Sequence, residues 1–294
     1  MDHTLHSTKR DAALAWLFSL LLSALLLASC GGSPNSTLTP VPSTLSMPKV
    51  MLITRDFSLA MPMRLHTGFV DITMINEGTQ TQSAQFARLK PGVTLEQVQE
   101  TVKKDRNAVL PLLVPAGGML AVKAGHSQEE ILDLSAGQYV VLNFIPEDET
   151  LPTVKALVTF FTVLGPVNTQ HVRPPRSAIK VTMRDFSFDT PDTLTPGLLT
   201  YQVTNRGEEA HEMVFLRLAG GKTWKDVMAF LQTPHVATLP GSIVGGMSAL
   251  SPSETAWVSM KLVPGTYVIL CFLPDKSSSL LHVQLGMICS ITVK

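Results

Sequence analysis

The sequence predicts an all-β protein built from two similar β-sandwiches, each with one short helix. Three observations support this: the chain repeats itself once, its apolar runs are short and bounded by Gly, Pro or Asn, and 45% of its 294 residues are apolar. Short strands separated by turn signals at regular spacing are typical of a β-sandwich. The apolar content is sufficient for two hydrophobic cores.

The chain begins with a predicted signal peptide, residues 1–29. Two basic residues precede an uncharged apolar run at 12–28, which is shorter than the ~20 residues that a spanning helix needs. The run ends in Leu27-Ala28-Ser29-Cys30, which resembles a bacterial lipobox, where the cysteine carries the lipid and becomes the first mature residue. We therefore expect an extracytoplasmic protein, anchored to the bacterial cell membrane through Cys30. An ordinary secretory signal with a chance cysteine is the alternative.

Residues 30–47 follow the predicted cleavage site. They are rich in Ser, Thr and Pro and almost free of charge, which is typical of a flexible tether. We expect this segment to separate the folded part of the chain from the membrane.

The rest of the chain contains an internal repeat. Arg55-Asp56-Phe57-Ser58 recurs as Arg184-Asp185-Phe186-Ser187, 129 residues later, and further matched segments follow in the same order. The repeat predicts two domains, residues 48–164 (the first repeat) and 177–294 (the second repeat). The proline-containing segment 165–176 between them is predicted to be a linker.

Strands and helices are predicted from local patterns within each repeat. Segments 198–203 and 267–272 are rich in β-branched and aromatic residues, and 256–262 alternates as in a half-buried strand. A helix of about ten residues is expected after Thr94 and another after Thr223, because threonine is a favourable N-cap.

Four potential metal ligands occur in the second repeat. Cys271 ends a predicted strand, His282 follows eleven residues later, and Met287 lies five residues further on. His211 lies upstream, after the Asn205-Arg206-Gly207 turn. Two imidazoles, one thiolate and a weak axial thioether are the ligand set of blue-copper sites. A strand end and the loop after it would bring three of these ligands to one end of a sandwich, and His211 would complete the site.

This pattern resembles the cupredoxins, the superfamily of plastocyanin and azurin. The Cys…His-x4-Met arrangement, with Gly286 directly before the methionine, is similar to the C-terminal signature of that superfamily. The resemblance covers residues 177–294 directly and 48–164 through the repeat. It implies two tandem Greek-key cupredoxin-like β-sandwiches and one type 1 copper per chain, with the ligands His211, Cys271, His282 and Met287.

One segment departs from the family pattern. The stretch between Cys271 and His282 is longer than in small cupredoxins and includes Ser277-Ser278-Ser279. We expect it to form a hairpin. Cys289 is interpreted as a structural thiol, and Glu209 and Glu212 as a solvated face, with orientation of the His211 ring as the alternative.

The first repeat lacks the ligand types. In the repeat alignment, the positions of the four ligands are taken by Gln82, Asn143, Pro152 and Leu157. Amides supply neither the thiolate nor the imidazole that type 1 copper needs. The first repeat is therefore predicted to bind no copper and to serve in docking or spacing.

The resemblance implies a single-electron carrier, whose redox partner protein the sequence does not indicate. The alternatives are a copper-binding or structural surface module without a redox role, and a copper storage or delivery protein. An oxidase or reductase is not expected, because the mature chain has no His-x-His pair and Cys271 has no histidine neighbour. The balance of 23 basic and 23 acidic residues gives no electrostatic footprint of a nucleic-acid-binding protein.

Overall fold

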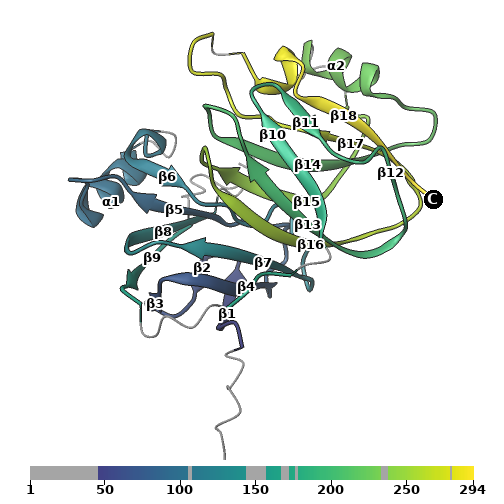
Figure 1. Cartoon of the computed structure of the whole chain (residues 1–294). Helices are drawn as coiled ribbons and strands as arrows, with labels where there is room; N and C mark the ends of the chain where they lie inside the picture. Colours follow the sequence, from purple (N-terminus) through teal and green to yellow (C-terminus); the bar gives the residue numbers. More distant parts are fainter. Residues whose placement is uncertain are drawn as a thin grey trace, which may run out of the picture. The chain divides into compact units, whose positions relative to one another are not determined.

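The computed structural model describes residues 46–104, 108–143, 157–166, 172–175, 178–232, 238–278 and 280–294. The predicted signal peptide, Cys30 and nearly all of the tether lie outside the described residues, as do Pro152 and Ser279. No helix in these described ranges is long and apolar enough to cross a membrane. The all-β prediction is confirmed: in the described part of the chain, the regular structure consists of strands apart from two short helices and two single turns of 3₁₀ helix (Figure 1).

The first repeat contributes strands to two sheets. Their orders are β2-β1-β4-β7 and β3-β9-β8-β5-β6. The strands are β1 (Lys49–Arg55), β2 (Ser58–Ala60), β3 (Arg64–His66), β4 (Gly68–Asn76), β5 (Gln85–Leu89), β6 (Leu113–Pro115), β7 (Ser127–Leu134), β8 (Gly137–Asn143) and β9 (Leu157–Leu164). Because β1 pairs in parallel with β4 and β5 belongs to the other sheet, the chain crosses between sheets, as in a Greek-key sandwich.

The second repeat has the same strand pairings. Its sheets have the orders β11-β10-β13-β16 and β12-β18-β17-β14-β15, and β10 pairs in parallel with β13. The strands are β10 (Ile179–Arg184), β11 (Ser187–Asp189), β12 (Thr193–Leu194), β13 (Gly197–Asn205), β14 (His211–Leu218), β15 (Gly241–Leu250), β16 (Thr255–Leu262), β17 (Gly265–Leu270) and β18 (Ile288–Val293). The predicted two-sandwich architecture therefore agrees with the strand order.

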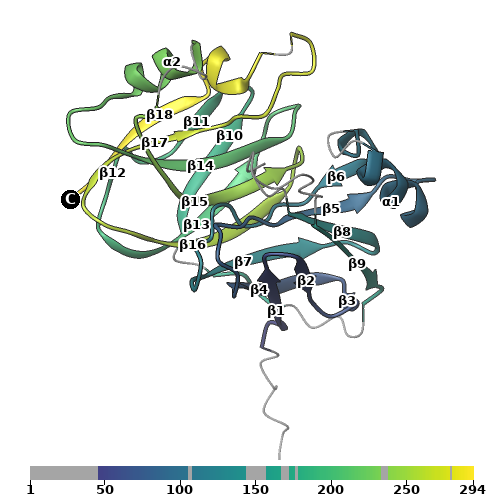
Figure 2. The ribbon, with the colours of Figure 1, turned by 180° about the vertical axis from the view of Figure 1, so that it is seen from behind.

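Strands β7 and β16 join the two repeats into one eight-stranded sheet (Figures 1 and 2). They pair antiparallel, with Val258 opposite Glu130. Most of β16 is buried rather than half-buried as its alternation predicted. The reason is that Trp257, on the face expected to be solvated, packs edge-on against Phe69 of the first repeat with ring centroids 5.5 Å apart. Residues 44–294 thus form one compact unit.

Each repeat carries the predicted helix, α1 (Leu95–Lys104) and α2 (Trp224–Gln232). Thr94 caps α1 by accepting a bond from the Gln97 amide at 3.1 Å, and the Gln97 side chain accepts from the Thr94 amide at 2.8 Å, which completes a capping box. Helix α2 begins after Thr223, whose amide and hydroxyl both donate to Asp226. Both helix predictions are confirmed.

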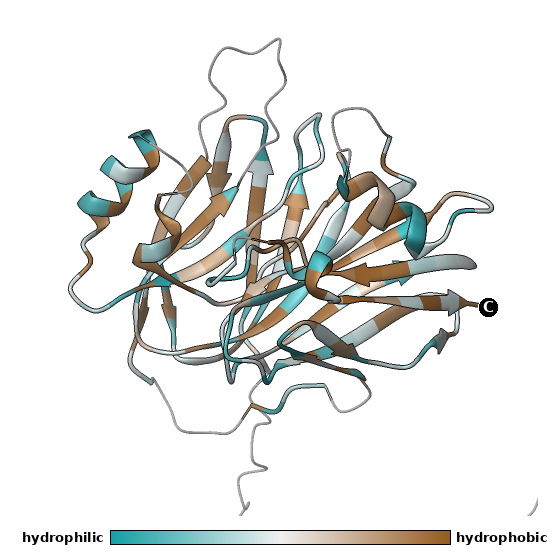
Figure 3. Cartoon of the chain, turned by 90° about the horizontal axis from the view of Figure 1, so that it is seen from above, coloured by the Kyte–Doolittle hydropathy of each residue, from teal (hydrophilic) through white to brown (hydrophobic). Residues whose placement is uncertain are grey.

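Apolar residues are frequent along the strands (Figure 3), and their buried side chains form the core. One buried cluster runs through both sandwiches, and each helix covers a smaller cluster on the outer face of its own five-stranded sheet. In the second repeat the central cluster ends at Cys271 and Met287, which have no solvent exposure. The sandwich core therefore leads directly to the predicted metal ligands.

Candidate metal centre

The four predicted ligands lie at one end of the second sandwich. His211 is the first residue of β14, Cys271 directly follows β17, and Met287 directly precedes β18. His282 begins the 3₁₀ helix His282–Leu285. All four side chains are at most 1% exposed. The site is therefore closed to bulk solvent and built from strand ends on a rigid frame.

The turn before His211 is held by Asn205. Its side-chain amide donates to the carbonyls of Glu209 at 2.7 Å and Leu250 at 2.8 Å, while its oxygen accepts from the Gly207 amide at 2.9 Å. A Cβ on Gly207 would lie 2.6 Å from the His211 Nε2 and would also collide with Asp185. Glycine is therefore required here so that the His211 ring and its carboxylate partner can meet.

Backbone hydrogen bonds hold the Cys271–Met287 segment. The Cys271 amide donates to the Met287 carbonyl at 3.3 Å, the Val283 amide to the Cys271 carbonyl at 2.9 Å, and the Met287 amide to the His282 carbonyl at 2.9 Å. An antiparallel bridge between Pro274 and Leu281 closes the long insertion, in agreement with the predicted hairpin. Three ligands are thus fixed relative to one another by main-chain contacts.

Asp275 shapes the tip of this hairpin. Its Oδ2 accepts bonds from the amides and hydroxyls of Ser277 and Ser278 at 2.6–3.1 Å. Although Asp275 also lies near Glu209 and His282, its carboxylate is engaged with the serines. We therefore assign Asp275 to the loop structure and not to the ligand set.

The potential ligand atoms of three residues converge. The Nδ1 atoms of His211 and His282 are 3.0 Å apart, and the Cys271 Sγ lies 3.4 Å from the His282 Nδ1. One ligand atom from each of the three lies within 4.8 Å of the other two. The structure thus brings together both imidazoles and the thiol, with the buried Met287 in the same core cluster.

Carboxylates bind the far nitrogens of both rings. The His211 Nε2 lies 2.9 Å from the Asp185 Oδ1, and the His282 Nε2 lies 3.3 Å from the Glu209 Oε2. An ionised carboxylate only accepts hydrogen bonds, so each Nε2 is placed to donate to its carboxylate, and the Nδ1 atoms of the two rings face each other. Carboxylate partners of this kind orient metal-binding histidines and raise their basicity.

Phe186 packs against the His282 ring. The two rings meet edge-on, with centroids 5.2 Å apart. Phe186 adopts φ of 64°, in the left-handed region that is unfavourable for a bulky residue. The Phe186 ring contributes to the burial of His282, which is 1% exposed.

Burial determines the electrostatics of the site. It lowers the pKa of His211, against the opposing effect of Asp185, and so disfavours a charged imidazolium. Burial and the neighbouring Glu212 raise the pKa of the Cys271 thiol. The pKa of Asp185 is lowered: burial alone would raise it, but the Glu208 amide, His211 and the Glu209 amide outweigh this by donating to the carboxylate.

These residues fit a bound cation. Two ring nitrogens only 3.0 Å apart, each with its Nε2 beside a carboxylate, need a proton or a metal ion between them. A buried thiol with a raised pKa becomes a thiolate when a metal ion replaces its proton. Imidazole and thiolate donors together suit copper or zinc. The donor set therefore fits the copper that the family resemblance implies.

The corresponding place in the first repeat is satisfied without an ion. The Asn143 side-chain amide donates to the Gln82 Oε1 at 3.0 Å, and the Gln82 amide donates to the Asp56 Oδ1 at 3.5 Å. Asp56 also accepts from the Thr79 amide at 2.7 Å, as Asp185 does from Glu208. The two amides thus complete each other's hydrogen bonds, whereas the second repeat has two imidazole nitrogens facing each other.

Sequence reasoning did not assign Asp185 to the site, and it gave ring orientation by Glu209 only as an alternative. Asp185 belongs to a motif recognised only as a mark of the repeat, although its recurrence as Asp56 signalled a structural role. Glu209 is largely buried against His282, so the interpretation as a solvated face is wrong for this residue. The alternative interpretation, that Glu209 orients a histidine ring, agrees with the structure, but the ring is that of His282 and not that of His211.

Comparisons with known proteins give only distant matches. No family model matches the chain, and no curated protein matches it. Among solved structures, an auracyanin from the photosynthetic bacterium Roseiflexus castenholzii is 19% identical with a TM-score of 0.29, covering 41% of this chain and 99% of its own. A multicopper oxidase is 13% identical with a TM-score of 0.25, covering 84% of this chain and 88% of its own.

A copper nitrite reductase from Nitrosomonas europaea is 11% identical, with a TM-score of 0.24 and coverage of 85% of this chain and 94% of its own. With TM-scores below 0.5, these similarities establish neither an activity nor a ligand for this chain. They include enzymes as well as an auracyanin, so they leave the expectation of a non-enzyme open.

Proposed function

We propose that the chain is a membrane-tethered, extracytoplasmic electron carrier with one type 1 copper in its second repeat. His211, Cys271 and His282 would be the strong ligands, and Met287 the weak axial one. The observation that carries this proposal is the buried pair of facing Nδ1 atoms, 3.0 Å apart beside a thiol. Bound copper supplies one-electron redox chemistry.

The rigidity of the site favours electron transfer. Main-chain bonds join the residues on both sides of the ligand loop, and carboxylates hold both rings. A site that is held in one geometry changes oxidation state with little rearrangement. Storage or delivery proteins need exposed, exchangeable ligands, whereas these four are buried.

The same burial argues against direct catalysis at this centre. A substrate would have to reach ligand atoms that have almost no solvent exposure. Electrons, in contrast, pass through packed side chains. The proposal therefore assigns exchange of electrons with a redox partner protein rather than turnover of a small molecule.

The remaining parts of the proposal rest on the sequence. The lipobox-like segment ending in Cys30 supports a lipid anchor in the bacterial cell membrane. The amide network around Gln82 and Asn143 supports a first repeat without copper, used for docking or spacing.

Copper(II) titration of the purified metal-free full-length protein tests the proposal. We expect an intense blue charge-transfer band that saturates at one copper per chain and that disappears and returns on reduction and reoxidation. Cys271→Ser should abolish the band, because the thiolate is its electron donor. The matched control, Cys289→Ser, should leave it unchanged.

Two results would contradict this assignment. A wild-type protein that stays colourless with copper(II) has no type 1 site, and loss of colour in Cys289→Ser but not in Cys271→Ser means that the thiolate is misassigned. A blue protein that cannot be reduced and reoxidised reversibly would support the alternative of a copper-binding module without a redox role.

A further inference from the structure

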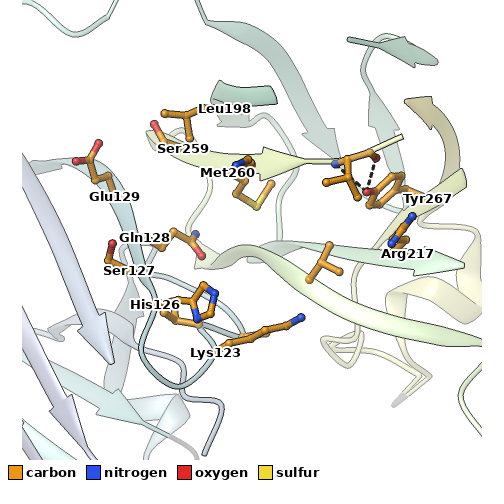
Figure 4. Close-up of a pocket in the computed structure, with 15 residues that line it drawn as sticks. Lys123, His126, Ser127, Gln128, Glu129, Leu198, Arg217, Ser259, Met260 and Tyr267 are labelled. Carbon is orange, nitrogen blue, oxygen red and sulfur yellow. Dashed lines mark hydrogen bonds between the residues drawn. The ribbon is translucent and has the colours of Figure 1, made fainter. Parts of the chain in front are cut away.

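A crevice of about 620 Å³ lies between the two repeats, and none of the candidate metal ligands lines it (Figure 4). Lys123 and His126 come from the segment before β7 in the first repeat. Arg217 of β14, Lys261 of β16 and Tyr267 of β17 come from the second repeat. The volume lies within the range of small-molecule sites.

The crevice has an excess of positive charge. Lys123, Arg217 and Lys261 are permanent cations, and Glu129 is the only carboxylate among the lining residues. None of these three cations takes part in an ion pair with another described residue. The cations are therefore available to an anion from solution.

Arg217 is held in place without being neutralised. Its Nη2 donates to the Pro264 carbonyl at 3.0 Å. Its guanidinium also borders Gly265, whose Cβ, if present, would lie 3.1 Å from the Arg217 Nε. In the described part of the chain its other N–H donors have no hydrogen-bond acceptor. A guanidinium fixed in this way offers paired donors to an oxyanion.

The repeat provides an internal comparison. At the position related by the repeat, a small pocket contains Arg88 and Tyr139, the equivalents of Arg217 and Tyr267. Its volume is only about 20 Å³. Two carboxylates of the small pocket occupy positions where the large crevice has basic side chains. Asp133 corresponds to Lys261, and Glu254 corresponds to His126.

The two pockets thus have an equivalent arginine and tyrosine but differ in the charge of their lining residues and in volume. The small pocket has two carboxylates in the same lining as its arginine; burial and Asp133 raise the pKa of Glu254, and Arg88 opposes them. The large crevice holds its arginine among further basic residues. Compared with the small pocket, the large crevice lacks these two carboxylates and has a volume of ligand size.

We propose that this crevice binds a small anion carrying a phosphate group. Guanidinium and ammonium groups together suit a phosphate, which carries several acceptor oxygens and more than one charge. Leu198, which is 73% exposed, and Val244 provide apolar wall for an organic part of the ligand. This site is independent of the metal centre.

Calorimetric titration of the metal-free full-length protein with inorganic phosphate, at low and constant ionic strength, tests the proposal. We expect saturable binding of one phosphate per chain. Arg217→Met and Lys261→Asp should each weaken it about tenfold or more, because each removes a charge-assisted contact. The matched control is Arg88→Met in the small pocket, which should leave phosphate binding unchanged.

A second titration, with glycerol phosphate, distinguishes an organic phosphate from free phosphate as the ligand. Tighter binding than of inorganic phosphate supports an organic phosphate such as a lipid headgroup, and weaker binding supports free phosphate. The proposal is overturned if the wild type shows no saturable binding of either probe. It is equally overturned if Arg88→Met weakens binding as much as Arg217→Met, since the effect is then one of general surface charge.

Discussion

Replacing Asp185 with alanine should weaken copper binding through the orientation of His211. The Asp185 Oδ1 accepts from the His211 Nε2 at 2.9 Å and from the backbone amides of Glu208 and Glu209 at 3.0 and 3.3 Å. Without the carboxylate, the His211 proton is free to move to Nδ1, the atom that would bind the metal. The ring also loses its fixed rotation.

The expected magnitude follows from these contacts. Loss of a carboxylate that orients a metal-binding histidine typically reduces affinity about 10–100-fold, which corresponds to roughly 1.4–2.7 kcal/mol. Because the two backbone amides are exposed, they regain hydrogen bonds to water once the carboxylate is removed. The free energy of unfolding of the metal-free protein should therefore fall only by the net value of the lost bonds to the carboxylate, about 1–3 kcal/mol.

The first repeat contains a matched control. Asp56→Ala removes the corresponding bonds from the amides of Thr79 at 2.7 Å and Gln80 at 3.4 Å, together with the Thr79 hydroxyl bond at 2.9 Å. It should cost a similar amount of stability in urea unfolding but leave copper affinity unchanged in a competition titration with a chelator. Equal copper affinities for Asp185→Ala and the wild type, or equal losses for both variants, would refute the reasoning.

Three further outcomes are expected. Burial raises the pKa of Glu130 to about 8 from 4.5, against the effect of the Gly118 amide, so the folded protein keeps a proton that the unfolded chain releases. Stability should therefore fall as pH rises from 4.5 to 8, and Glu130→Gln should flatten this decline in urea unfolding; an unchanged slope would contradict the assignment. Met287→Leu should keep the blue copper but raise its reduction potential in a redox titration, because an axial donor is lost; a lowered potential would disprove the axial role. Cys30→Ala should move the protein from the membrane to the soluble fraction, and retention after a carbonate wash would rule out the lipid anchor.

Local patterns in the sequence were sufficient for the elements of the fold. Short β-branched runs between turn residues predicted strands, and Thr94 and Thr223 marked the starts of both helices. These features depend on neighbours within a few residues along the chain, which is why they can be predicted from one sequence. The family resemblance selected His211, Cys271, His282 and Met287, and the structure places all four at one end of a sandwich.

The sequence by itself therefore determined the strands, the helices and the types of ligand, whereas tertiary structure decided which distant groups meet. The pairing of β7 with β16 buried Trp257 on a face that its alternation predicted to be solvated. Asp185 and Glu209 became partners of the two imidazoles only through the packing of loops far apart in the chain. The cationic crevice likewise needs residues from both repeats. Such contacts depend on strand register and on the packing of one repeat against the other, and a pattern of a few residues records neither.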